Sequence, residues 1–422
     1  MSQVKTYACS EGVTLRTFLS PHFKTMRVSV NLLVPASEDR AAAYGLLPSL
    51  ISRASRRYPS YTALGRRLAE LYGAGLGSSV QKIGGYQMLG ISVEGISGRY
   101  AFGGEDMFAE LTGLLFDVIF DALKDRDGLY PLDGFLQEKR QQLEQKDSDF
   151  SDKMIYAHQR CHEILFEGSP AGIDRLGSRE SIKALRREDL LGVWEELLSR
   201  SRIEISVLGD CGPDLEAFRE KFSPLGKGWK LGPVPYTHPV LRRVTEEQPV
   251  AQSKLAMAFR ADVPPGDRQL FQLMSAVLGE PVSSKLFLHV REDQGLCYYC
   301  DSTFSWANGT LFIESGVETG DLDRVEAAIL EQLAAMRRGE ITEAELRGAK
   351  LYLCNSLYSI SDSLHRVEGW YLGQALSPEE ELTPEQAAER LMKYTAADVA
   401  EAANRLRPAV VYRLKGSGCG WS

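Results

Sequence analysis

Apolar and polar positions along the chain predict the same order of secondary-structure elements twice. Runs in which apolar and polar residues alternate predict strands, and apolar residues spaced three and four positions apart predict helices. The first half gives a strand at 26–36, helices at 44–55 and 62–73, and two strands within 77–96. The second half gives a strand at 254–263, helices at 268–279 and 283–295, and two strands within 296–318. This repetition indicates an internal duplication.

Downstream, the two halves continue in parallel. Each has an amphipathic helix after the strand pair, at 105–123 and 322–338, and then a long helical pattern, at 133–150 and 342–359. Each closes with a helix followed by a strand. We therefore expect an α+β protein of two homologous domains, each a mostly antiparallel sheet covered by helices, related by a pseudo-two-fold duplication.

A segment rich in Pro and Gly separates the two halves. Residues 222–248 show neither helical nor strand periodicity, which is typical of a linker. We expect an N-terminal domain at 1–222, the linker at 223–248 and a C-terminal domain at 249–422. The length of 422 residues agrees with two domains of about 200 residues each.

Composition and charge narrow the class of protein. Apolar residues make up 44% of the chain and charged residues 25%, as in soluble globular proteins. The net charge of −8 provides no basic surface for phosphates, which argues against nucleic acid as a partner. No apolar run reaches the roughly 18 residues that span a membrane, and the first residues lack the pattern of a secretory signal. Because the seven cysteines are scattered as reduced thiols usually are, we expect a cytoplasmic protein.

The segment from Ser284 to Tyr298 is the most informative motif. An apolar helical run ends at Arg291, breaks at Gly295 and continues into a strand that carries Tyr298. A guanidinium and a phenol seven residues apart, joined by a tight turn, can point into one cleft and hold a peptide carbonyl. The alternative is that Arg291 pairs with Glu292 at the surface and that Tyr298 packs half-buried.

Two other groups of residues are weaker candidates. His158 and His162 lie four positions apart on a predicted helix, a spacing that suits metal ligation, but the one further ligand type beside them, Cys161, points to a different side. Cys297 and Cys300 have the spacing of a redox or zinc motif, yet residues three apart on a strand face opposite sides of the sheet. We therefore expect solvated or packing histidines and two core thiols.

The motif at Ser284–Tyr298 resembles the pitrilysin/insulinase family of zinc peptidases, which includes the mitochondrial processing peptidases. It agrees with the family pattern S-x-L-F-x-x-x-R-E-x-x-G-L-x-Y, and the duplicated order of elements extends the resemblance over nearly the whole chain. One departure is the segment GEPVSS before the motif, where the family often has a glycine-rich loop. The segments GLLPSLISRASRRYPS and LAELYGAGLG also resemble the YmfF-type proteins of Gram-positive bacteria.

The zinc motif of this family, G-x-x-H-x-x-E-H, is degenerate in the sequence. The resemblance places its ligand and base positions on Pro48, Ile51 and Ser52, and the family's further glutamate ligand falls near Glu138. A catalytic zinc needs three protein donors and a carboxylate that accepts the proton of the bound water. We therefore expect this chain to bind no cofactor of its own and to hydrolyse no peptide unaided.

The resemblance implies a catalytically incomplete subunit of a heterodimeric zinc metalloendopeptidase that cleaves peptides or leader peptides. In such an assembly a homologous partner subunit carries the H-x-x-E-H site and its zinc, while this chain supplies Arg291 and Tyr298 as substrate-binding groups. Two other functions stay open, a non-proteolytic structural scaffold and a protein that binds unfolded peptides.

Overall fold

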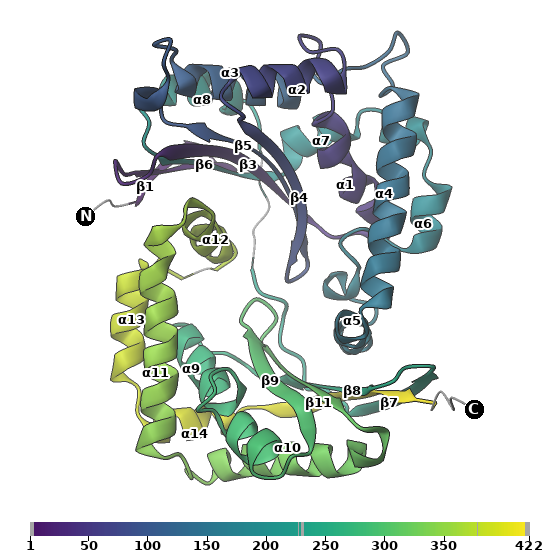
Figure 1. Cartoon of the computed structure of the whole chain (residues 1–422), viewed down its shortest axis with the longest axis vertical. Coiled ribbons are helices and arrows are strands. Elements are labelled where there is room, and N and C mark those ends of the chain that lie inside the picture. The colour runs from purple at the N-terminus through teal and green to yellow at the C-terminus, as the bar shows by residue number, and fades with distance from the viewer. Residues whose placement is uncertain (1–3, 227, 229–231, 378, 418–422) are drawn as a thin grey trace. The chain divides into compact units, whose positions relative to one another are not determined.

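The computed structural model describes residues 4–226, 228, 232–377 and 379–417. The chain divides into two compact units, neither of which is continuous in sequence (Figure 1). The first unit draws on segments 1–147, 173–231 and 363–373, and the second on segments 148–172, 232–362 and 374–422. Each unit therefore includes one segment from the other half of the chain. The predicted domain limits given above remain a prediction.

The first unit is built on a six-stranded sheet. Its strands are β1 (Val4–Ser10), β2 (Val13–Leu19), β3 (Thr25–Pro35), β4 (Gly75–Ile83), β5 (Tyr86–Ile96) and β6 (Arg202–Gly209). They lie in the order β1-β2-β6-β3-β5-β4, and every neighbouring pair is antiparallel except β2 and β6, which run parallel. The edge strand β4 is largely exposed, whereas β3 in the middle is almost wholly buried.

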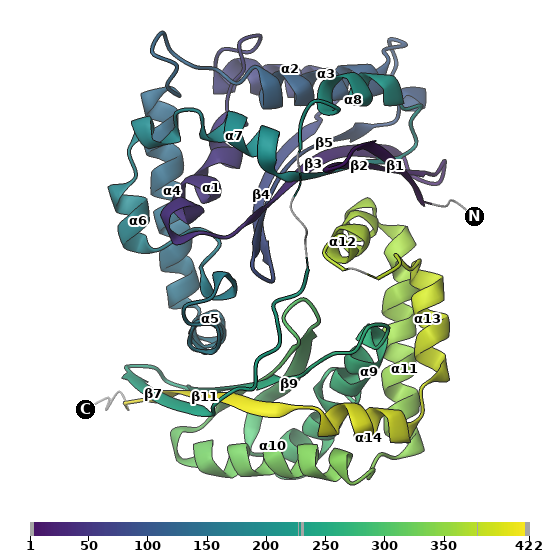
Figure 2. The ribbon, with the colours of Figure 1, turned by 180° about the vertical axis from the view of Figure 1, so that it is seen from behind.

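Helices cover one face of this sheet (Figure 2). The layer is formed by α1 (Glu38–Ile51), α2 (Tyr61–Glu70), α3 (Met107–Phe120), α4 (Leu132–Ser151), α6 (Arg179–Ala184), α7 (Val193–Arg200) and α8 (Leu215–Phe222). Side chains alternate along β3: Val28 and Val30 face the helices and join the apolar core, whereas Ser29 faces the other side. Helix α12 (Leu364–Gln374), from the second half of the chain, lies against that second face.

The second unit repeats this arrangement with a five-stranded sheet. Its strands are β7 (Arg242–Gln248), β8 (Ser253–Arg260), β9 (Cys297–Ser305), β10 (Thr310–Val317) and β11 (Arg407–Gly416), in the order β7-β11-β8-β10-β9. The helical layer is formed by α9 (Arg268–Gly279), α10 (Leu322–Arg337), α11 (Glu343–Tyr358), α13 (Pro384–Lys393) and α14 (Ala396–Asn404). The other face receives α5 (Lys153–Leu165) from the first half, whose Ala157, Cys161 and Ile164 pack against β8 and β11.

The two sheets share one topology. The order β2-β6-β3-β5-β4 corresponds strand by strand to β7-β11-β8-β10-β9, and in each sheet the first pair is parallel and the rest are antiparallel. Each sheet also carries a helical layer on one face and one helix from the opposite half on the other. The predicted α+β fold with two homologous domains is confirmed.

The pattern along the sequence did not predict strand β7, which lies within segment 223–248. Its sequence is RRVTEEQ, and the structure leaves four of its seven residues exposed and three partly buried. The partly buried positions of β7 alternate with exposed ones but hold Val244, Glu246 and Gln248, so no apolar alternation distinguishes the strand from a loop.

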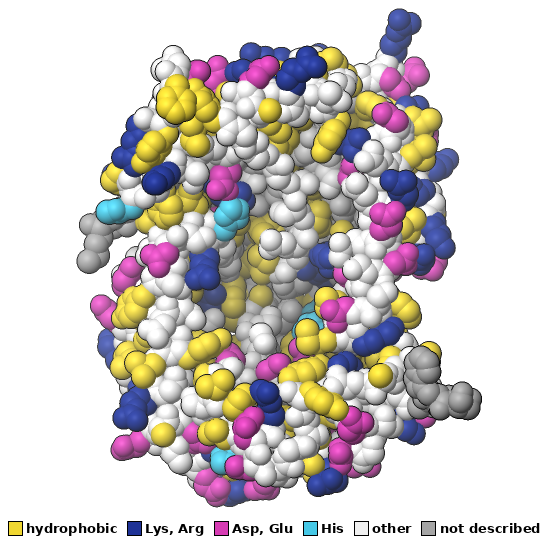
Figure 3. Space-filling view, in the orientation of Figure 1, with side chains coloured by type: hydrophobic (Ala, Val, Ile, Leu, Met, Phe, Trp, Pro, Cys, Tyr) yellow, Lys and Arg dark blue, Asp and Glu magenta, His cyan; other side chains and the backbone are white. Residues whose placement is uncertain are grey.

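Surface properties agree with the composition. Among the described residues, the structure has no helix that is both long enough and apolar enough to cross a membrane. On the face shown in Figure 3, Lys and Arg side chains are interspersed with Asp and Glu side chains rather than gathered in one basic area.

Candidate functional site

Arg291 lies at the end of a π-helical segment, η4 (Leu286–Glu292). Leu286 is buried and anchors the segment, whereas the Arg291 side chain is 41% exposed. Its guanidinium lies over the ring of Phe287, 4.8 Å from the ring centroid, and its Nε is 3.6 Å from Oε1 of Glu292. Both contacts are weak at an exposed position, so a peptide carbonyl can replace them at little cost.

A turn at Gly295 joins η4 to β9 and positions Tyr298. Gly295 has a φ of 59°, which glycine adopts without steric cost, and its N–H donates to the carbonyl of Arg291 at 3.1 Å. The Tyr298 side chain is exposed, and its hydroxyl donates to the carboxylate of Glu318. This hydrogen bond raises the pKa of Tyr298, so the phenol keeps its proton at neutral pH.

The structure therefore places Arg291 and Tyr298 on the surface of the second unit, on either side of one turn. Glu292 lies beside Arg291, as the surface-pair alternative anticipated, but Tyr298 is 55% exposed rather than half-buried. Their role in substrate binding stays a prediction. Glu318, which holds the phenol, was not predicted, because it lies 20 residues further along the chain and nothing in the motif points to it.

The expectation that Cys297 and Cys300 face opposite sides of the strand is wrong. Cys300 pairs with Ser315 and Cys297 pairs with Val317, so three residue steps on β9 match only two on β10. Tyr298 lies at the resulting β-bulge, where one residue is inserted into the strand. Residues paired across a sheet point to the same face, so the two cysteines do as well.

The degenerate zinc motif lies at the C-terminal end of α1 in the first unit. Pro48 and Ile51 are buried, and the Oγ of Ser52, directly after the helix, donates to the carbonyl of Pro48 at 2.7 Å. None of the three side chains offers the imidazole, thiolate or carboxylate that zinc requires. These residues do not fit a zinc ion.

Glu138, on α4, is neutralised by an arginine. The Nη1 atom of Arg53 lies 2.6 Å from Oε1 of Glu138, and the two side chains are 17% and 9% exposed. A cavity of about 280 Å³ adjoins Glu138, and half of its lining residues are serines and glutamines: Ser49, Ser78, Ser79, Gln141, Gln142 and Gln145. Arg53 follows the degenerate motif directly. This position could have pointed to Arg53 as the partner of Glu138, but the pair was not predicted from the sequence.

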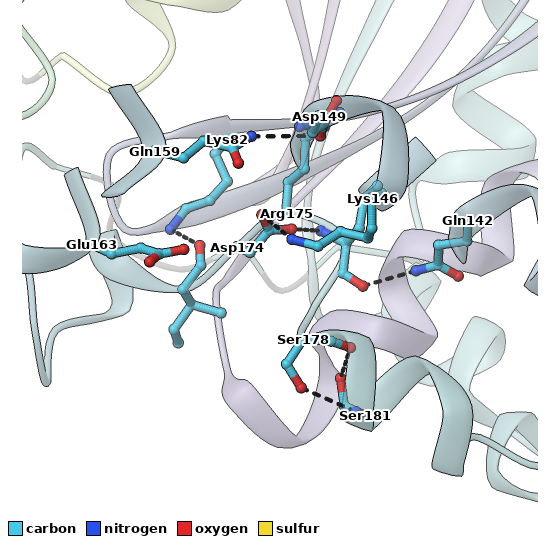
Figure 4. Close-up of polar contacts among 12 residues, drawn as sticks. Lys82, Gln142, Lys146, Asp149, Gln159, Glu163, Asp174, Arg175, Ser178 and Ser181 are labelled. Atoms are coloured by element: carbon cyan, nitrogen blue, oxygen red, sulfur yellow. Dashed lines mark hydrogen bonds and ion pairs between the residues drawn. The ribbon is translucent and has the colours of Figure 1, made fainter. Parts of the chain in front are cut away.

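Arg175 and Leu176, which line this cavity, belong to a loop that neighbouring side chains hold by hydrogen bonds (Figure 4). The Nζ of Lys82 donates to the carbonyl of Ile173 at 2.6 Å, and the Nε2 of Gln142 donates to the carbonyl of Leu176 at 2.9 Å. Burial lowers the pKa of Lys82 to about 8. The region is thus a fixed polar pocket that offers hydrogen-bonding groups in place of metal ligands.

His158 and His162, on α5, contact neighbouring side chains of the second unit. The Nδ1 of His158 is 3.2 Å from Oε1 of Glu314, and the rings of both histidines lie beside Phe312. Wherever the structure describes the chain, no group of three or more His, Cys, Asp or Glu side chains is arranged to hold a metal ion.

Comparison with known proteins finds relatives in one peptidase family. Residues 184–353 match the family described as "Peptidase M16 inactive domain". The chain is 23% identical over 417 residues to "Probable inactive metalloprotease YmfF" of Bacillus subtilis, with 96% of each protein covered. It is also 23% identical over 365 residues to "Uncharacterized zinc protease YmxG" of the same bacterium, covering 84% of this chain and 83% of the relative.

A solved structure agrees with these relatives. A conserved protein from Enterococcus faecalis V583 aligns with a TM-score of 0.89 and 27% identity over 99% of both chains. The predicted resemblance to the pitrilysin/insulinase peptidases and to YmfF-type proteins is confirmed. The degenerate zinc motif, the duplicated sheets and these matches lead to one conclusion: the chain is an inactive homologue of the M16 peptidase family.

Proposed function

We propose that this chain is the catalytically incomplete subunit of a heterodimeric zinc metalloendopeptidase that cleaves peptides or leader peptides. The observation that carries the proposal is the contrast between two motifs. The zinc positions hold Pro48, Ile51 and Ser52, whereas Arg291 and Tyr298 are retained with their polar groups exposed to solvent. Such a chain lacks the means to activate water but keeps the means to hold a substrate.

Arg291 and Tyr298 act on the peptide backbone. Arg291 holds a carbonyl of the substrate, because a guanidinium stays charged and offers several donors in one plane. The hydroxyl of Tyr298 turns from Glu318 to donate to the scissile carbonyl or to a neighbouring one. A donor aimed at the developing oxyanion contributes about 2.7–4 kcal/mol to the transition state. These contacts recognise the backbone, so they suit many peptide sequences.

The zinc that activates the attacking water belongs to a homologous partner subunit with an intact H-x-x-E-H motif. Two relatives from one bacterium support this division, since one is named as an inactive metalloprotease and the other as a zinc protease. The family resemblance also supports a divided enzyme, because the family includes processing peptidases whose functions are divided between subunits. We place the pair in the cytoplasm.

A reconstitution assay tests the proposal. A library of quenched fluorescent peptides is incubated with this chain, with its zinc-bearing homologue from the same genome, and with an equimolar mixture, and zinc is measured in each protein. We expect cleavage in the mixture alone, with zinc in the homologue alone. Activity with stoichiometric zinc in this chain alone would overturn the proposal. A mixture that associates but cleaves nothing would favour the structural scaffold instead.

A further inference from the structure

Cys297 and Cys300 are brought together by the bulge in β9. On a regular strand, residues three apart are separated by about 10 Å and diverge. Here the two cysteines oppose Val317 and Ser315, which are two steps, or about 6.6 Å, apart on β10. The Cα atoms of a disulfide are usually up to about 6.8 Å apart. The bulge therefore brings this pair within reach of a disulfide, and the bend of a bulged strand shortens the span further.

The two thiols differ in their exposure to solvent. Cys300 is 5% exposed on the face of β9 that α9 covers, where Ser302 donates to the carbonyl of Ser275. Cys297 is partly exposed next to the turn after η4. A reagent from solution can thus reach Cys297, while Cys300 is reached from Cys297.

The electrostatic setting also favours Cys297 as the reactive group. Its hydrogen bond with Cys300, followed by the Ser315 hydroxyl and the charge of Arg291, holds the pKa of Cys297 below its usual range. The same hydrogen bond and burial raise the pKa of Cys300. At neutral pH Cys297 is therefore the more ionised of the two, with a large share as the nucleophilic thiolate, and Cys300 is the thiol.

We propose that Cys297 and Cys300 form a redox-active dithiol that a small-molecule disulfide oxidises to an intramolecular disulfide. The Cys297 thiolate attacks one sulfur of the small disulfide, forms a mixed disulfide and expels the other half as a thiolate, which takes up a proton. Cys300 then loses its proton and attacks the Sγ of Cys297, forming the internal S–S bond and expelling the second small thiolate. Counted from the dithiol, the protein loses two electrons and two protons, one when Cys297 ionises and one from Cys300, and one small disulfide becomes two thiols.

Closure of this disulfide has a structural consequence for the neighbouring motif. Tyr298 lies between the two cysteines, so the internal bond constrains the backbone that presents its phenol. Any effect of that constraint on peptide cleavage rests on the proposed function. The thiol chemistry itself does not depend on it.

Peptide mapping of the full chain tests the dithiol directly. The reduced protein is treated with oxidised glutathione, its remaining thiols are alkylated, and it is digested with trypsin. Cleavage after Arg291 and Arg324 releases peptide 292–324, whose only cysteines are Cys297 and Cys300. We expect this peptide to lose two hydrogens and to carry neither an alkyl group nor glutathione. Alkylation of both cysteines, or a glutathione that persists on Cys297 of the wild-type protein, would overturn the proposal.

Single substitutions separate the two roles. In Cys300→Ser, glutathione is retained on Cys297, because the resolving thiol is missing. In Cys297→Ser, peptide 292–324 acquires neither an internal disulfide nor glutathione, because Cys300 is buried. Cys354→Ser, which changes a buried cysteine on α11, is the matched control and oxidises as the wild type does. Unmodified Cys297 in Cys300→Ser would contradict its assignment as the attacking thiol.

Discussion

Arg27, on β3, and Glu368, on α12, form a buried ion pair with 2.6 Å between Nε and Oε2. The second carboxylate oxygen of Glu368 accepts hydrogen bonds from the Oγ of Ser29 and, at 3.0 Å, from the Nδ2 of Asn31. The three donors occupy alternate positions of β3, so they share one face of the sheet. One carboxylate from the second half of the chain thus satisfies the polar face of a strand from the first.

Replacing Glu368 with Ala is expected to destabilise the first unit. The substitution leaves the guanidinium of Arg27, whose side chain is 14% exposed, without its main counter-charge. Removing one partner of a buried ion pair costs about 3–5 kcal/mol. Urea unfolding, together with faster hydrogen exchange in β3 and α12, measures the loss. Glu389→Ala, at an exposed position on α13, is the control and should change stability by less than about 0.5 kcal/mol. An equally small change in Glu368→Ala would contradict the argument.

The Arg53–Glu138 pair should behave as a coupled unit beside the cavity of the degenerate zinc motif. Arg53→Ala leaves the nearly buried carboxylate of Glu138 unpaired, which costs about 3 kcal/mol. Glu138→Gln added to that variant removes the charge and should recover much of the loss, so a double-mutant cycle reports the coupling.

A matched control for this cycle is Arg57→Ala. Its side chain is 63% exposed and lies 3.5 Å from Asp117, so its removal should cost less than about 1 kcal/mol. Additive losses in the Arg53 and Glu138 cycle would refute the coupling.

Stability should fall as the pH rises because of Glu280, which follows α9 directly. Burial raises its pKa from 4.5 to about 7. The folded state therefore binds this proton more tightly than the unfolded state, and the resulting stabilisation is complete below about pH 4.5 and lost as the pH rises through about 7. The loss is at most on the order of 3 kcal/mol.

Melting temperatures between pH 4.5 and 8 check this dependence. Glu280→Gln cannot ionise, so it should match the wild type at low pH and exceed it at pH 8. Glu389→Gln is the control at an exposed site and should follow the wild-type profile. Parallel profiles for the wild type and Glu280→Gln would rule out the assignment.

Substitutions of Arg291 and Tyr298 should slow cleavage by the reconstituted pair. Tyr298→Phe removes the hydroxyl alone, and loss of one oxyanion donor lowers the rate about 100- to 1,000-fold. Arg291→Ala removes the group that holds a substrate carbonyl and should also lower kcat/KM. Tyr352→Phe, at a partly exposed position on α11, is the control and should leave the rate unchanged. Unchanged rates in both site variants would exclude the proposed roles.

Much of the fold could be predicted because the helices carry clear apolar faces. The helix expected at 268–279 is observed as α9, and the strand expected at 254–263 overlaps β8. Strand β7 could not be predicted, since two of its three partly buried positions hold polar residues and leave no apolar alternation. The exchange of α5 and α12 between the units was also invisible, because local periodicity shows that a helix has an apolar side but not which sheet it covers.

The candidate site was only partly predictable, because local patterns do not show contacts between residues that are distant in sequence. The motif from Ser284 to Tyr298 correctly predicted a helical segment, a glycine turn and a strand. It did not predict that Glu318 would hold the phenol or that Arg53 would neutralise Glu138. Both partners are distant along the sequence from the groups that they contact, and such pairs form only when the chain folds.

The amino-acid sequence by itself determined the duplicated order of elements and the loss of zinc ligands at Pro48, Ile51 and Ser52. These features depend on residue type and local spacing, which the sequence states directly. Tertiary structure alone decided that Cys297 and Cys300 share one face. The facing of two residues on a strand depends on its register with the neighbouring strand, and one inserted residue reverses it.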